Sequence, residues 1–89
     1  GVMLVDETVS EHWMQQMAAE MNLSETAFLL PQGNGYAIRY FTPEVEIPLC
    51  GHATLASAHW LYESGSVSSS ESISFASKAG ALKVHKEQE

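Results

Sequence analysis

Hydrophobic and polar residues repeat with a helical period near the start of the chain. Trp13, Met17 and Met21 recur at four-residue spacing with polar residues between them, and this pattern predicts an amphipathic surface helix of about three turns. The S/T-x-x-E pattern Thr8–Glu11 predicts a capping box at its start. Asn22 favours the left-handed conformation in which many helices end, so the helix is expected to stop there.

A second helix is expected from Gly51 to Glu63, where apolar residues occupy nearly every side. Leu55, Trp60 and Tyr62 leave no clearly polar face, and a helix that is apolar nearly all round is a buried one. Small residues between these bulky ones indicate strands packed closely around it. The pattern therefore predicts a central, buried helix.

The remaining apolar segments predict strands. Thr26–Leu30 and Tyr36–Phe41 flank the turn-forming segment Pro31–Gly35, which favours a hairpin. Apolar and polar residues alternate again over 72–85, which predicts a second hairpin with one buried face. Gly1–Val5 has the character of a strand end. The predicted fold class is α+β, with an antiparallel, barrel-like sheet wrapped on the buried helix and one amphipathic surface helix.

The charge balance excludes several classes of partner. The 89 residues hold four basic and eleven acidic side chains, a net charge of −7. Nucleic acid and anionic membrane surfaces are therefore not expected as partners. Residues 1–63 hold eight acids and a single base, Arg39. An anionic substrate would have to be bound by backbone N–H groups or by Arg39.

Cysteine and histidine usage limits the chemistry further. The single cysteine, Cys50, cannot form an internal disulfide, and a free thiol in an acidic chain fits the cytoplasm. No pair of histidines has metal-ligand spacing, so no metal is expected. No apolar run approaches about 18 residues and no basic segment opens the chain, so neither a membrane span nor a signal peptide is expected.

Glu25 is the first candidate for chemistry. It lies between a helix stop and an apolar strand, and Ser24 and Thr26 flank it with hydroxyl groups that can orient its carboxylate. Partial desolvation there would raise its pKa and suit it to general acid–base catalysis. The alternative is that Glu25 is a solvated turn residue.

The second candidate is the start of the predicted buried helix. Cys50, Gly51, His52 and Thr54 bring a thiol, an imidazole and a hydroxyl to a helix N-terminus, where free N–H groups favour anions. Glycine at Gly51 allows a close approach to the backbone. The alternative is that Cys50 packs as a small hydrophobe and that His52 is a capping donor.

Three segments carry a resemblance to a known family. The Asn-Leu-Ser-Glu-Thr-Ala-Phe block at 22–28 and the Cys-Gly-His-Ala-Thr block at 50–54 are the most specific signals, and Ile38–Pro43 lies between them at matching spacing. Together they closely resemble the PhzF-like phenazine-biosynthesis family. The likeness runs over nearly all 89 residues.

The resemblance implies a diaminopimelate-epimerase-like fold. That fold has two lobes, each with an antiparallel barrel-like sheet around a central helix, and its active site lies in the cleft between them. A full family member is much longer than this chain. Residues 1–89 are therefore expected to form one partial N-terminal lobe.

The resemblance also implies an activity. The family's best-known member isomerises a dihydro-hydroxyanthranilate by proton transfer, without cofactor or metal, so an isomerase or epimerase lobe acting on a small carboxylate is expected. Glu25 matches the glutamate that moves the proton, and His52 matches the histidine of the Gly-His motif that assists it. Cys50 stands where epimerases and racemases of the same fold place a cysteine. Substrate contacts are expected from Asn22, Ser24, Cys50, Gly51, Ala53 and Thr54.

Because the second lobe is missing, the sequence leaves open whether the chain is an enzyme. The alternative function is a non-catalytic, truncated lobe that binds a small molecule and self-associates through its exposed cleft face as a homodimer. A third reading is a fragment with no function of its own.

Overall fold

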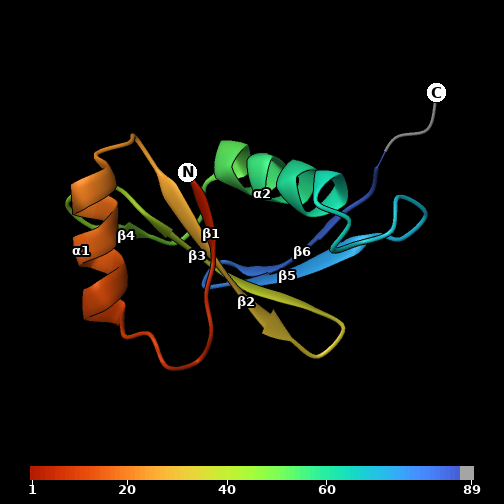
Figure 1. Ribbon diagram of the computed structural model, residues 1–89, viewed down its shortest axis with the longest axis horizontal. Coiled ribbons are helices and arrows are strands. Elements are labelled where there is room, and N and C mark those ends of the chain that lie inside the picture. The colour runs from red at the N-terminus through yellow and green to blue at the C-terminus, as the bar shows by residue number, and fades with distance from the viewer. Residues whose placement is uncertain (87–89) are drawn as a thin grey trace.

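The computed structural model describes residues 1–86. These residues form one mixed sheet and two α-helices (Figure 1). In chain order the elements are β1 (Val2–Leu4), α1 (Glu11–Met21), β2 (Thr26–Gln32), β3 (Gly35–Phe41), β4 (Glu46–Ile47), α2 (Gly51–Glu63), β5 (Ile73–Ser77) and β6 (Gly80–Val84).

The sheet corrects the prediction of an antiparallel, barrel-like architecture. Its order is β1-β2-β3-β5-β6, with β4 also paired to β3. The two predicted hairpins are present as the antiparallel pairs β2–β3 and β5–β6. However, β1 runs parallel to β2, and β3 runs parallel to β5. The described strands form an open sheet rather than a closed barrel, and the α+β class is confirmed.

The parallel pairs follow from the helices between their strands. A parallel connection needs a long crossover, which α1 supplies between β1 and β2 and α2 supplies between β3 and β5. Both crossovers move the same way across the sheet, but they start from strands of opposite direction. Since such crossovers are right-handed, the two helices come to lie on opposite faces of the sheet.

Residue alternation along the strands divides the core in the same way. Ala27, Leu29, Ile38 and Tyr40 are buried against α2, and the intervening Phe28 is buried against α1. The α1 side is completed by Met14, Ala18 and Phe41, and the α2 side by Ala53, Ala58, Leu61, Ile73 and Phe75. Figure 1 shows the two helices well apart, with strands running between them.

The start of α1 differs from the predicted capping box. Ser10 is the N-cap, and its side chain accepts a hydrogen bond of 3.0 Å from the backbone N–H of Trp13. Thr8 instead donates its N–H and its hydroxyl to the Asp6 carboxylate. The helix therefore starts two residues later than a Thr8 cap requires. Its end is as predicted, since Asn22 has a left-handed φ of 50°.

Helix α2 has the predicted bounds but is not buried on all sides. Ala53, Ser57, Ala58 and Leu61 face the sheet, whereas the side chain of Leu55 is 62% exposed. The prediction of a fully buried helix was wrong because an open sheet covers only one side of it. Within residues 1–86 no helix is long and apolar enough to cross a membrane.

Candidate functional site

The two segments singled out in the sequence meet in the structure. Glu25 immediately precedes β2, and Cys50 is the N-cap of α2. The Cys50 Sγ donates a hydrogen bond of 3.3 Å to Oε1 of Glu25. Because α2 packs against β1 and β2, its first turn comes to lie beside the residue at which β2 begins.

The electrostatics of Glu25 correct the expected rise in its pKa. Its carboxylate is partly exposed rather than enclosed. Hydrogen bonds from the hydroxyl of Ser24 and the thiol of Cys50 lower the pKa of Glu25, and the charges of His52 and the Gly1 amino group lower it further. These donors outweigh the opposing effect of burial. Glu25 is therefore a carboxylate at neutral pH, the form that accepts a proton.

The first turn of α2 presents unused donors next to this carboxylate. Cys50 makes no side-chain cap to the helix, and the first intrahelical bond runs from Thr54 N to Cys50 O over 3.0 Å. The N–H groups of Gly51, His52 and Ala53 precede that bond and are not used by the helix. Gly51 and His52 are exposed, so this turn can accept an anion from outside.

The hydroxyl of Thr54 makes hydrogen bonds within the fold. Its Oγ1 donates to Cys50 O over 2.8 Å and shares a hydrogen bond of 2.6 Å with the hydroxyl of Tyr40. Burial raises the pKa of Tyr40, which keeps that hydroxyl protonated. Sequence reasoning missed Tyr40, although a buried tyrosine hydroxyl usually has a hydrogen-bond partner.

The other predicted residues occupy distinct places. Ser24 is exposed beside Glu25, and its hydroxyl contributes to the lowered pKa of that carboxyl group. Asn22 ends α1, with its N–H bonded to Ala18 O at 3.1 Å, and is exposed. His52 is exposed on the first turn of α2, so its ring is open to solvent and to a ligand. Ala53 is buried and offers only its backbone.

Arg39 is not available to a substrate anion. Its guanidinium binds the Glu46 carboxylate through two hydrogen bonds, of 2.7 and 2.6 Å, and Glu11 through one of 2.6 Å. Residue alternation places it on the α1 face of the sheet with Phe41, over whose ring it lies. The sequence indicated two possible donors for an anionic substrate, Arg39 and backbone N–H groups. Because Arg39 is bound to Glu46 and Glu11, the backbone N–H groups remain.

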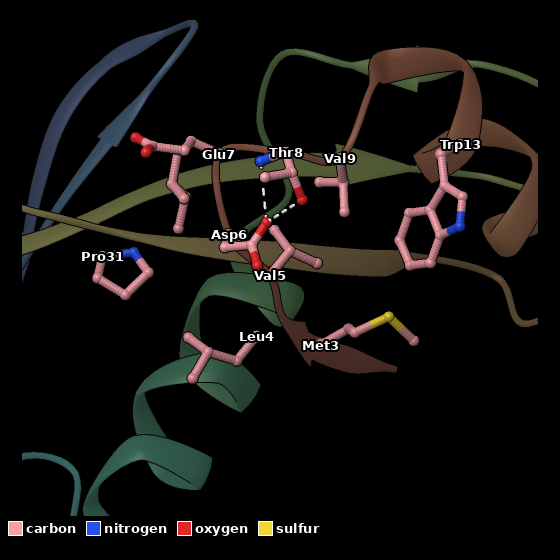
Figure 2. A pocket seen from close by; sticks show the side chains of 10 residues that line it. Met3, Leu4, Val5, Asp6, Glu7, Thr8, Val9, Trp13 and Pro31 are labelled. Atoms are coloured by element: carbon pink, nitrogen blue, oxygen red, sulfur yellow. Dashed lines mark hydrogen bonds between the residues drawn. The ribbon is translucent and has the colours of Figure 1, made fainter.

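A separate hollow lies along β1 and the loop that follows it (Figure 2). It has a volume of about 750 Å³, and Met3, Leu4 and Trp13 line it together with the Asp6–Val9 loop. Figure 2 shows Asp6 bonded to Thr8 at its rim. None of the predicted site residues lines this hollow. No group of three or more histidine, cysteine, aspartate or glutamate side chains arranged to hold a metal ion is found within residues 1–86.

Comparison with known proteins identifies the class to which this fold and site belong. The model of the family described as phenazine biosynthesis-like protein, PhzC-PhzF, matches residues 1–89. The chain belongs to this family.

Individual relatives agree with that assignment. An uncharacterised isomerase of Halalkalibacterium halodurans is 56% identical over 77 residues, which are 86% of this chain and 29% of that protein. The mouse phenazine biosynthesis-like domain-containing protein 2 is 42% identical over an alignment that covers 100% of this chain and 33% of the mouse protein. The crystal structure of a PhzF-family protein from Enterococcus faecalis superposes with a TM-score of 0.88 at 49% identity, covering 97% of this chain and 33% of that one. The chain thus spans about a third of the length of these relatives.

Proposed function

We propose that this chain is the lobe of a cofactor-independent isomerase or epimerase, in which Glu25 moves a proton on a small carboxylate substrate. The observation that supports the proposal is the ionised, partly exposed Glu25 carboxylate held beside the uncapped N-terminus of α2. A proton acceptor and a set of anion donors then face the same space. Family membership and the printed description of the Halalkalibacterium relative as an isomerase point the same way.

Each group of the site has a part in this reaction. Glu25 takes a proton from carbon and returns it at another position. The free N–H groups of Gly51, His52 and Ala53 hold the substrate carboxylate, or the negative charge that develops when the proton leaves. The His52 ring beside Glu25 assists the transfer, and Ser24 orients the Glu25 carboxylate. The remaining wall of the cleft, with the second lobe, belongs to a chain of full family length, and the activity is proposed for that protein.

The pH dependence of catalysis tests the assignment of the base. The reactive form of Glu25 is the carboxylate, and its fraction falls as the pH falls through the pKa of the folded protein. Because that pKa is lowered, the acid limb of kcat/KM should lie below the usual glutamate value of about 4.3. The measurement is a pH profile of kcat/KM in a chain of full family length. An acid limb at about pH 6.5, the usual pKa of histidine, would assign the base to an imidazole instead.

A second candidate function is a non-catalytic lobe that pairs with a second copy of itself. The observation in its favour is the exposed apolar surface around α2, where Leu49 is 45%, Leu55 62% and Trp60 37% exposed. Burying such side chains against a second copy would contribute free energy to association.

Light scattering behind a sizing column tests this second candidate. A homodimer that persists on dilution is expected if the α2 surface is an interface, and Leu55→Asp should convert it to a monomer. Val45→Asp is the matched control, since Val45 is 54% exposed but lies outside this surface. A wild-type chain that stays monomeric at every concentration would exclude the self-associating lobe.

A further inference from the structure

We propose that Cys50 is the positioning residue of Glu25: its thiol holds one carboxylate oxygen, so that the other oxygen faces the substrate. The inference rests on the proposed function for its catalytic meaning, but the contact itself is a property of the fold. It assigns to the only cysteine of the chain a role different from nucleophile, from substrate ligand and from inert packing.

A comparison of the two helix starts within residues 1–86 shows what is unusual about Cys50. Ser10, the N-cap of α1, has an extended backbone and uses its side chain to accept the N–H of Trp13. Cys50, the N-cap of α2, is also extended, with φ −142° and ψ 110°, but makes no such bond. Its Sγ is directed instead at Oε1 of Glu25. The side chain that would ordinarily cap the helix thus binds Glu25, which immediately precedes β2.

Hydrogen bonds from Thr54 hold the backbone of Cys50 in place. Its carbonyl accepts two hydrogen bonds from Thr54, one from the N–H over 3.0 Å and one from Oγ1 over 2.8 Å. Thr54 is joined in turn to the buried hydroxyl of Tyr40 in β3. Cys50 also packs, half-buried, against the core between α2 and the sheet. The direction of the thiol is therefore set by the fold, and the thiol can set the direction of Glu25.

A thiol suits this task better than the usual N-cap side chains. Serine, threonine and aspartate caps accept a hydrogen bond from the second or third N–H group of a helix, which here would occupy the donor of His52 or Ala53. Sulfur is a weak acceptor and the S–H group a weak donor. Cys50 therefore leaves the helix donors free for an anion. Its single bond to Oε1 orients Glu25 and is readily given up when the carboxyl group takes a proton.

Titration of Glu25 tests the inference directly. The 13C resonance of the Glu25 carboxyl carbon is followed by NMR as the pH is changed, in the chain of 89 residues. The variant Glu25→Gln identifies this resonance, because it is absent from its spectrum. Cys50→Val keeps an apolar side chain of similar size without a donor, and Cys50→Ser keeps a donor. The other groups that face Glu25, namely Ser24, His52 and the Gly1 amino group, are common to all variants.

In Cys50→Val the midpoint of the Glu25 titration should rise toward the ordinary glutamate value, because a hydrogen bond to the charged form is lost. Cys50→Ser should titrate below Cys50→Val. Amide spectra check the fold, and Cys50→Ala replaces Cys50→Val if valine disturbs it. An unchanged midpoint in the variant without a donor would overturn the role of the thiol.

The failure of this inference and the failure of the proposed function give different results. If the midpoint responds to Cys50 but the full-length protein shows no proton transfer that depends on Glu25, the contact is real and the function is wrong. If Glu25 is essential to turnover but its midpoint ignores Cys50, the function stands and the positioning role falls. In an active protein the acid limb of kcat/KM should move with the midpoint, whereas a purely structural role of Cys50 would leave that limb in place.

Discussion

Replacing Glu25 with glutamine is expected to lower kcat/KM of the full-length protein by about 10²- to 10⁴-fold, the usual contribution of a positioned acid–base group. The amide keeps the size of the side chain and accepts the hydrogen bond from Cys50, so the site should keep its shape. It cannot take a proton from carbon at neutral pH. The loss should therefore fall mainly on kcat, with KM little changed.

Two variants make the result specific to Glu25. Glu25→Asp keeps a carboxylate but retracts it from Cys50 and the α2 turn, and it should retain part of the activity. Glu20→Gln removes the same charge from an exposed position on α1 and should behave as wild type. Normal kcat/KM in Glu25→Gln, or an equal loss in Glu20→Gln, would remove Glu25 from the reaction.

Replacing Phe28 with alanine is expected to cost about 3–5 kcal/mol of the free energy of unfolding, the usual range for a buried phenylalanine. Phe28 is 1% exposed and joins α1 to the sheet through edge-to-face contacts with Phe41, at 5.5 Å between ring centres, and with Trp13, at 6.2 Å. A chain of this size has little stability to spare. Most of its molecules should therefore be unfolded or close to the transition at room temperature.

Urea unfolding followed by circular dichroism measures this effect. Val45→Ala, at a side chain that is 54% exposed, is the control and should change the free energy of unfolding by no more than about 0.5 kcal/mol. If Phe28→Ala unfolds at the same urea concentration as the control, the packing of α1 on the sheet is not what stabilises this face.

The sequence predicted the local elements of the fold well. Helix α2 has the predicted bounds, Gly51–Glu63, and both hairpins form around their turn residues. The local signals were sufficient because periodicity and turn chemistry act within a few residues. The prediction of Thr8 as the cap of α1 was wrong because Ser10 satisfies the same capping preference. Thr8 is bound to Asp6 instead, and Ser10 is the N-cap.

The arrangement of these elements was harder to predict. The parallel pairs β1–β2 and β3–β5 join residues separated by a whole helix, and no local pattern encodes that pairing. The exposure of Leu55 likewise depends on which side of α2 the sheet covers. The apolar composition of a helix does not tell which of its sides the strands of its own sheet cover.

The candidate site shows the same division. Glu25, Cys50 and His52 stand out in the sequence as polar residues at unusual places, and family resemblance pairs them. The contact between Glu25 and Cys50 spans 25 positions, so propensity could not reveal it. The direction of the Glu25 pKa was mispredicted for the same reason, since the donors Ser24 and Cys50 and the partial exposure of the carboxylate are properties of the folded chain.

Exchange of hydrogen between substrate carbon and solvent isolates the proton step from binding and product release. We would incubate a chain of full family length in D2O with the small carboxylate substrate that the proposed function requires and follow the reacting C–H signal by 1H NMR, comparing wild type with Glu25→Gln and Glu20→Gln. We expect deuterium to enter that position with wild type and Glu20→Gln, and not with Glu25→Gln. Exchange that continues at the wild-type rate in Glu25→Gln would contradict the role of Glu25 as the group that carries the proton.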